Sequence, residues 1–144
     1  MRYELTIEGK PSNIVLKSLG TGDNIIKKVD FLISQENQET NSRAANLFHT
    51  LLIEGELKES TKRETRQLLE WSRQTENAKV YKNVTLIVKQ DVEVIRNYYL
   101  KDMYCVSYQE CFDDEDSGKG DYGRFVLMMR QKKGSIDSIN VQED

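Results

Sequence analysis

The chain has 144 residues, of which 21 are Lys or Arg and 24 are Asp or Glu, so its formal net charge is -3. Because the two signs are interspersed along the sequence, it offers no basic face of the kind that binds nucleic acid. The length predicts a single domain over residues 1–144, and no apolar run approaches the 18 residues that a membrane-spanning helix needs, so no direct membrane anchoring is expected.

Alternation of apolar and polar residues predicts strands along most of the chain. The first strand begins at once, with Tyr3, Leu5 and Ile7 on one face. We therefore expect a protein that is made soluble, without a signal peptide, and that leaves the cell only if another route carries it. Further strands are predicted over residues 13–19, 25–34, 45–57, 80–89, 95–112 and 123–132.

Two segments interrupt the strand pattern. Residues 35–43 contain no apolar side chain, which predicts an exposed loop. Over residues 61–74, leucines and a tryptophan recur at helical intervals and predict one α-helix. Thr61 and Glu64 have the spacing of a capping box at its start.

The predicted strand over residues 95–112 is unusually long, and Asp102 is its one weak β-former after Tyr98. From Tyr98 to Phe112 it would reach roughly 50 Å at about 3.3 Å per residue. A compact chain of this length has a radius of gyration of only about 14 to 15 Å. The strand must therefore bend, break at a bulge or project beyond its domain. An acidic hairpin is predicted after it, over residues 113–122.

No catalytic, cofactor or metal site is predicted. Residues 118–123 match G-x-G-x-x-G, but a strand follows where a dinucleotide site needs a helix. The single histidine, His49, lies in an apolar strand without a nucleophile motif and is expected to be partly buried. Cys105 and Cys111 are six residues apart, so we expect both on one buried face, outside disulfide distance. An enzyme is not expected.

Four segments in order resemble one family, the hemolysin-coregulated tube proteins of type VI secretion and related contractile injection systems, particularly their Bacteroidetes-type branch. The segments are residues 29–35, 68–71, 84–88 and 100–113. The most specific are the Leu-Leu-Glu-Trp run on the predicted helix and the Tyr-Cys-Val strand that ends in Phe-Asp. The resemblance spans about residues 3–129 and implies a mainly β fold, a small β-barrel of two packed sheets with one α-helix, in hexameric rings.

In function, the resemblance implies a structural subunit of the inner tube, in which homo-hexameric rings stack, carry effectors and are expelled by a sheath. The implied partners are other copies of the chain, sheath, baseplate or spike proteins, and effector cargo. Assembly would take place in the cytoplasm, before export by the apparatus. The alternative is a small self-contained β-barrel that binds a peptide or another ligand. Rings or tubes in electron micrographs would distinguish the two.

Two sets of residues are expected to carry the assembly. The long strand and the strands that flank it are expected at the interface within a ring, because unpaired strand edges recruit neighbouring chains. Its interface residues are Tyr98, Leu100, Tyr104, Val106, Tyr108 and Phe112. The polar loop is expected to leave the ring plane and contact the next ring, as the resemblance implies. Its stacking residues are Gln35, Glu36, Asn37, Glu39, Asn41 and Arg43.

Overall fold

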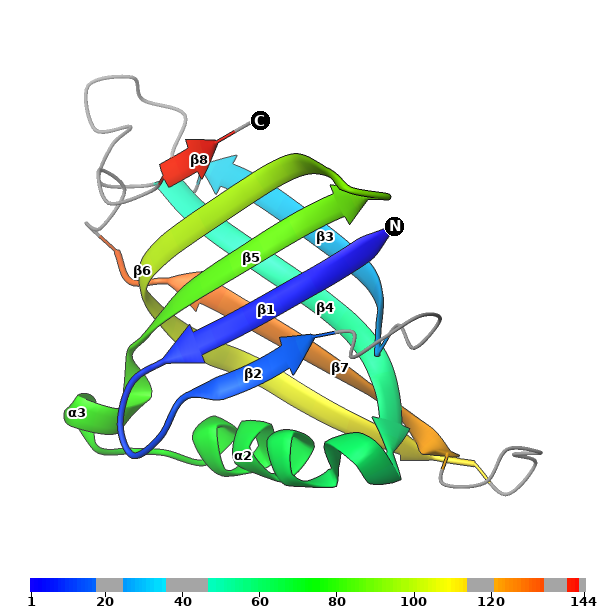
Figure 1. Cartoon of the computed structure of the whole chain (residues 1–144). Helices are drawn as coiled ribbons and strands as arrows, with labels where there is room; N and C mark the ends of the chain where they lie inside the picture. Colours follow the sequence, from blue (N-terminus) through cyan, green and yellow to red (C-terminus); the bar gives the residue numbers. More distant parts are fainter. Residues whose placement is uncertain (18–24, 36–46, 114–120, 134–139, 143–144) are drawn as a thin grey trace.

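A computed structural model describes residues 1–17, 25–35, 47–113, 121–133 and 140–142, in which strands dominate (Figure 1). The strands are β1 (Arg2–Glu8), β2 (Ile14–Lys17), β3 (Ile26–Gln35), β4 (Leu47–Lys58), β5 (Lys82–Gln90), β6 (Glu93–Phe112), β7 (Asp121–Gln131) and β8 (Asn140–Gln142). The helical elements are the 3-10 helix η2 (Glu59–Thr61), α2 (Lys62–Ser72) and the short α3 (Asn77–Val80). The prediction of a mainly β fold with one principal helix is confirmed.

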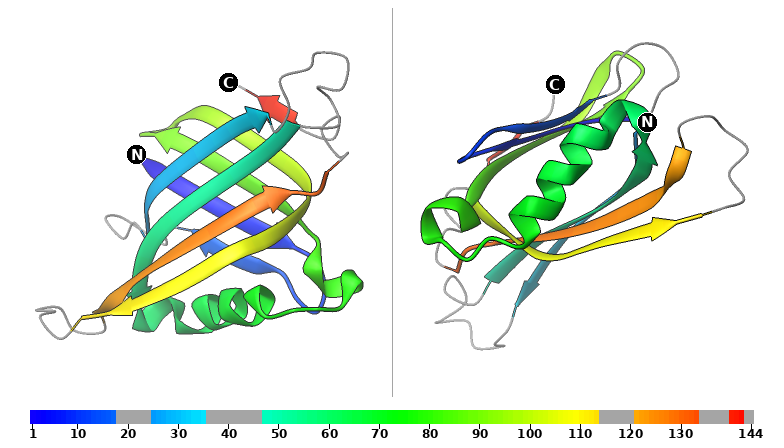
Figure 2. Two further views of the ribbon diagram at one scale, coloured as in Figure 1. Left: turned by 180° about the vertical axis from the view of Figure 1, so that it is seen from behind. Right: turned by 90° about the horizontal axis from the view of Figure 1, so that it is seen from below.

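The strands form one antiparallel sheet in the order β2-β1-β5-β6-β7-β4-β3, with β8 added beside β6. This sheet folds over on itself into two layers, and α2 lies across one open end (Figure 2). The two packed sheets that were predicted are the two layers of this one folded sheet. Strand β6 belongs to both layers, because its first half pairs with β5 and its second half pairs with β7.

Two irregularities allow the 20-residue strand β6 to turn this corner. Asp102 has a φ of 56°, in the left-handed region, and the register against β5 shifts at this point. Further along, the register against β7 shifts between Cys105 and Ser107, which leaves Val106 as an extra residue. Bulges of this kind bend a strand and increase its twist. The weak β-former Asp102 thus marks the bend, as the sequence indicated.

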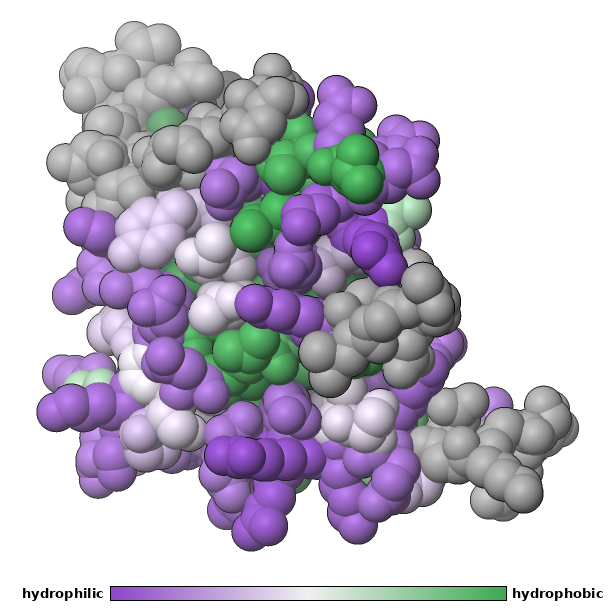
Figure 3. Space-filling model, in the orientation of Figure 1, coloured by the Kyte–Doolittle hydropathy of each residue, from purple (hydrophilic) through white to green (hydrophobic). Residues whose placement is uncertain are grey.

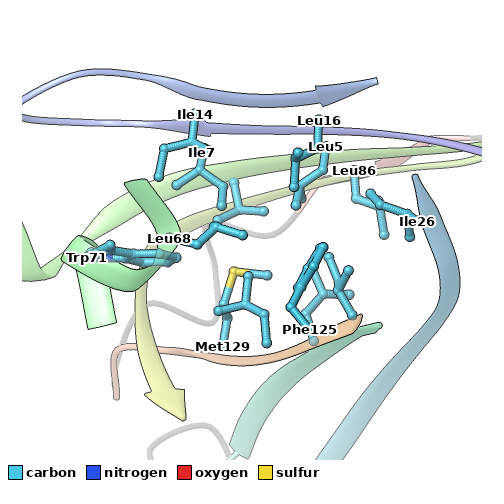
Figure 4. Close-up of a cluster of buried hydrophobic side chains, with 14 of the residues drawn as sticks. Leu5, Ile7, Ile14, Leu16, Ile26, Leu68, Trp71, Leu86, Phe125 and Met129 are labelled. Atoms are coloured by element: carbon cyan, nitrogen blue, oxygen red, sulfur yellow. The ribbon is translucent and has the colours of Figure 1, made fainter. Parts of the chain in front are cut away.

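The core fills the space between the two layers. Side chains such as Leu5, Ile7 and Leu86 from one layer meet Phe125 and Met129 from the other, and each of these five is fully buried (Figure 4). Packing is close enough that a Cβ atom placed on Gly55 would lie 2.5 Å from the ring of Phe125. Burying these apolar side chains supplies the main stabilisation of the fold.

One face of helix α2 covers one end of the hydrophobic core. Leu68 and Trp71 point into the barrel (Figure 4), and Trp71 Nε1 donates a hydrogen bond to the carbonyl of Val80 at 2.8 Å. The predicted capping box is wrong. Thr61 makes no side-chain cap and instead donates to the Lys58 carbonyl at 3.3 Å, because it ends the 3-10 turn η2 that leads directly into α2.

Strand β3 is less buried than its alternating pattern predicted. Val29 and Phe31 are half-buried, but Ile33, which shares their face of the strand by alternation, is 54% exposed. In the described residues, β3 pairs with β4 alone and ends the sheet. Its inward face is covered only in part, because Phe31 packs against Tyr98 of β6 whereas Ile33 stays exposed. No helix among the described residues is long and apolar enough to span a membrane.

Candidate assembly surfaces

The free edge of β3 is the first candidate surface. Leu32 and Ile33 are consecutive in this strand and are 58% and 54% exposed. Their backbone edge faces no other strand in the described part of the chain. An exposed edge that carries large apolar side chains is a template for pairing with another chain. This combination makes β3 the strongest candidate for contact with a neighbouring copy.

The other end of the sheet, strand β2, is shorter and partly covered. It packs against α2, and Gln67 of this helix donates a hydrogen bond to Ser12 Oγ at 3.0 Å, just before the strand. Val15 is its exposed apolar residue. Short, partly covered strands are weaker pairing templates than long open ones.

The end of β6 and the start of β7 form a hairpin stem that projects past α2 (Figures 1 and 2). Phe112 at its end is 72% exposed. Gly123, opposite Phe112, has a φ of 147°, and a Cβ atom there would collide with the carbonyl oxygen of Cys111. Glycine is therefore required at position 123, where the two strands of the stem approach closely. Of the three alternatives for the long strand, a bend and a bulge occur in its middle, and this end projects (Figure 1).

Between the stem and α2 lies an open apolar hollow of about 350 Å³, which we call the α2 groove. Its apolar lining is Leu57, Leu69, Phe112 and Tyr122. Its polar lining is Lys58, Lys62, Thr65, Arg66 and Glu110. The Tyr122 hydroxyl donates a hydrogen bond to Glu59, which ties the stem to the start of the helix. The groove is a second apolar surface that the described residues leave open.

Three of the six predicted interface residues belong to the chain's own interior. Leu100 is fully buried, so its place at a ring interface is corrected. Tyr98 is half-buried and its ring lies 4.7 Å from that of Phe31. Tyr108 is half-buried against Phe125, and burial together with the nearby carboxylate of Glu110 raises the pKa of its hydroxyl. All three lie on the core face of β6, Tyr98 and Leu100 before the corner at Asp102 and Tyr108 after it.

The other three residues reach the surface but do not lie together. Tyr104 is on the outer face of β6, edge-on to Tyr81, with ring centroids 6.1 Å apart. Val106 is the exposed extra residue of the second bulge, and Phe112 lies at the end of the stem. Of the predicted interface set, Phe112 is the residue that joins an uncovered apolar surface.

The predicted stacking loop falls mostly outside the described residues. Gln35 is the last residue of β3 and is half-buried. The remaining five, Glu36, Asn37, Glu39, Asn41 and Arg43, lie outside the described residues. Their role in stacking stays a prediction.

The two cysteines differ from expectation. Across the β6–β7 ladder, Cys105 lies opposite Met129 on the core face, whereas Cys111 lies opposite the exposed Arg124 on the outer face. The extra residue Val106 reverses the alternation between them, so the prediction of one shared buried face is wrong. Burial raises the pKa of the Cys105 thiol to about 11, although a hydrogen bond from the Ser107 backbone acts in the opposite direction.

The remaining polar groups of the interior serve the fold. His49 is buried and its Nδ1 lies 2.6 Å from Gln131 Oε1, as expected for a histidine in an apolar strand. Burial lowers the pKa of Lys82, whose ammonium donates to the Lys10 carbonyl beside a cavity of about 20 Å³ under α2. That volume has room for about one water molecule. In the part of the chain that the structure describes, no three His, Cys, Asp or Glu side chains gather as a metal site would require.

Both uncovered apolar surfaces include large apolar residues that the sequence pattern did not assign to a surface. Leu32 and Ile33 are neighbours in a strand, and Leu68 and Leu69 are neighbours in a helix. One member of each pair must point away from the core, because successive strand residues face opposite sides and successive helical residues are about 100° apart. Consecutive large apolar residues were therefore the signal for an exposed surface.

No family model matches the chain, and no curated protein matches it. Solved structures do match. The chain is similar to the structure of Hcp1 from Flavobacterium johnsoniae, with a TM-score of 0.55 and 13% identity over 100% of both chains. It is also similar to a crystal structure of an Hcp protein, with a TM-score of 0.59 and 10% identity, again over 100% of both chains.

A third similar structure comes from an assembled machine, the PVC sheath-tube complex of an extracellular contractile injection system in its extended state. Here the TM-score is 0.52 at 12% identity, and the match covers 99% of this chain and 89% of that one. At these identities the likeness shows the fold. The chain thus has the fold of the Hcp proteins over its whole length.

Proposed function

We propose that this chain is a structural, non-enzymatic subunit of the inner tube of a contractile injection apparatus. Its Hcp fold supports this role, and so does the sheath-tube origin of one similar structure. The observation that carries the proposal is the open edge of β3, where Leu32 and Ile33 are more than half exposed beside a backbone edge that no other described strand pairs with. Pairing with another chain would satisfy the hydrogen-bonding groups of this edge and remove its apolar side chains from water.

In this proposal, six copies close into a ring. The edge of β3 in one copy meets a different surface of the next, which is a heterologous contact, and such contacts close into rings when the rotation allows. Rings then stack into a tube that a sheath surrounds and expels with its effector cargo. The protein would assemble in the cytoplasm beside sheath and baseplate proteins and leave through the apparatus.

The alternative function is a self-contained barrel that binds a peptide or another ligand. The barrel interior is filled with apolar side chains from both layers (Figure 4), so a ligand would have to bind outside it. The α2 groove is the observation that favours this alternative, because its apolar lining is open to solvent. A ligand-binding module would remain monomeric at high concentration, whereas a tube subunit would assemble.

The test is to place a charge on the β3 edge. Leu32→Lys should keep the fold, since the side chain is 58% exposed, but should prevent ring formation. Thr6→Lys, on the outer face of the doubly paired strand β1, is the matched control and should assemble normally. Native mass spectrometry of both variants and of the wild type gives the number of subunits. Rings of normal size from Leu32→Lys would argue against the β3 edge as a contact between subunits.

A further inference from the structure

The α2 groove is a shaped apolar site with a specific charge around it. Leu69 is 41% exposed and Phe112 is 72% exposed, and they line it together with Leu57. Leu68, one residue before Leu69, is fully buried, so α2 presents one leucine to the core and the next to the groove. A side chain of moderate size from another chain would find an apolar lining here on both the helix and the stem.

The rim of the groove carries more positive than negative charge. Lys58, Lys62 and Arg66 line it with a single carboxylate, Glu110. Lys58 is also paired with Glu56 at 3.0 Å, and Arg66 with Glu70 at 3.3 Å. Lys62 and Arg66 lie in the first half of α2, where the helix dipole adds positive potential. An apolar side chain flanked by carboxylates therefore fits the groove best.

The same chain displays such a group at the turn between β5 and β6, which we call the acidic turn (Asp91–Val92–Glu93). Val92 is 97% exposed at its tip, and Asp91 and Glu93 beside it are both exposed. Gln90 pairs with Glu93, so only two residues connect the strands, and Asp91 is held at a φ of 56°. In Figure 3 a hydrophobic patch appears at the end of the barrel where β5 turns into β6. Val92 is thus presented on a short, well-defined turn.

The turn between β5 and β6 lies at the end of the barrel opposite α2 (Figure 1), and the α2 groove is lined by residues of α2 at the other end. Strand β5 begins at Lys82, beside α2, and runs for nine residues to the turn, a distance of about 30 Å. A chain therefore cannot place the turn in its own groove. A second copy can, and the contact would be heterologous, which generates rings or continuous stacks.

We propose that the acidic turn of one copy docks in the α2 groove of the next, with Val92 against Leu69 and Phe112, and Asp91 and Glu93 facing Lys62 and Arg66. This contact rests on the proposed function, since it places two copies of the chain head to tail. It supplies a second connection between subunits besides the edge of β3. Apolar contact at the centre and charge pairs at the rim are the usual arrangement of a specific interface.

Cross-linking between two cysteine variants tests the contact directly. One variant carries Val92→Cys and the other Leu69→Cys, both with Cys111→Ser so that the outer-face thiol is removed. After the two are mixed and allowed to assemble, a short bis-maleimide should give a covalent dimer that contains one chain of each. Lys17→Cys, an exposed position at the end of β2, replaces Val92→Cys in the control mixture and should give no such dimer with Leu69→Cys.

A charge reversal adds a quantitative test. Asp91→Lys with Glu93→Lys should raise the concentration needed for assembly about tenfold, since two rim pairs are lost and replaced by like charges. Lys62→Glu with Arg66→Glu in the same chain should restore it. Circular dichroism confirms that each variant folds, as expected for substitutions of exposed side chains.

The outcomes separate this contact from the tube proposal. Rings or tubes that form without the mixed dimer, and that tolerate the charge reversal, would overturn the contact and leave the tube intact. The mixed dimer without rings would support the contact and contradict the hexameric ring. Cross-linking only between two Leu69→Cys chains would overturn the contact in favour of groove-to-groove pairing. If neither assemblies nor the mixed dimer formed, both the contact and the tube proposal would be overturned.

Discussion

His49 Nδ1 of β4 lies 2.6 Å from Gln131 Oε1 of β7, and both side chains are buried. Gln131 also donates through Nε2 to the Lys101 carbonyl at 2.9 Å, beside the bend of β6 at Asp102. Because Gln131 uses its amide nitrogen there, its oxygen accepts, and His49 carries a proton on Nδ1. One buried glutamine thus connects β4 and β7 to the corner that joins the two layers.

Replacing Gln131 with leucine should destabilise the fold. The substitution leaves the buried Nδ1–H of His49 without its partner, which costs about 1 to 3 kcal/mol, and it also removes the hydrogen bond to the Lys101 carbonyl. Gln109→Leu is the matched control, since Gln109 is exposed on the outer face of β6, and it should change stability by less than about 0.5 kcal/mol. Urea unfolding of both variants measures the difference. Equal unfolding midpoints would show that the network contributes nothing.

The bend at Asp102 should tolerate glycine but not valine. At a φ of 56°, glycine adopts the backbone without strain, whereas a β-branched side chain is strained by about 1 to 3 kcal/mol. Asp102→Gly should therefore unfold at a similar urea concentration to the wild type, and Asp102→Val at a clearly lower one. A valine variant as stable as the glycine variant would mean that the strand does not bend here.

The two cysteines should differ in reactivity. At pH 8 the Cys105 thiol, with a pKa raised to about 11, is almost entirely protonated and packs against the core, so it should resist a thiol reagent until the chain is unfolded. Cys111 should react in the native protein. Counting modified thiols by mass spectrometry in wild type and Cys111→Ser checks this. If both thiols of the wild type reacted at the same rate, the placement of the two cysteines on opposite faces of β6 would be contradicted.

The same shift predicts a loss of stability at alkaline pH. The folded pKa of Cys105 lies above its ordinary value of 9.0, so folding favours the protonated thiol. That contribution is complete below pH 9 and is lost as the pH rises through about 11. Tyr108, whose pKa is also raised, acts in the same direction. Urea midpoints should fall over this range, and less steeply in Cys105→Ser; parallel curves for the two proteins would refute the assignment.

Tube length should depend on the polar loop between β3 and β4. Reversing Glu36 and Glu39 to lysine should leave single rings intact and shorten or abolish tubes, because charge pairs across rings, each worth about 0 to 1 kcal/mol, are repeated around every junction. The effect should weaken at high salt. Tubes of normal length from this variant at low salt would place stacking elsewhere, for instance at the α2 groove.

The sequence was a good guide wherever a pattern is local. Alternation in β4 and β5, helical spacing in α2 and the weak β-former Asp102 each predicted what the structure shows. These signals come from side-chain periodicity and backbone preference, which act over a few residues. The buried state of His49 followed in the same way from its apolar strand.

These local patterns did not predict how distant parts of the chain are arranged. One extra residue at Val106 reverses every side chain after it, which moved Cys111 to the outer face, and a single bulge leaves little trace in composition. Leu100 was placed at an interface because strand length indicated projection, but it lies opposite the buried Val84 of β5 on the core face. The α2 groove brings together residues from β4, α2, β6 and β7, and that meeting depends on the tertiary fold.

The most direct test of the central claim is electron microscopy of the purified wild-type chain at high concentration. The tube proposal predicts six-membered rings with a central channel, singly or in stacks, in which neighbouring copies contact one another through the edge of β3. A uniform monomer of 16.8 kDa at every concentration, also unable to join tubes in its native context, would contradict it.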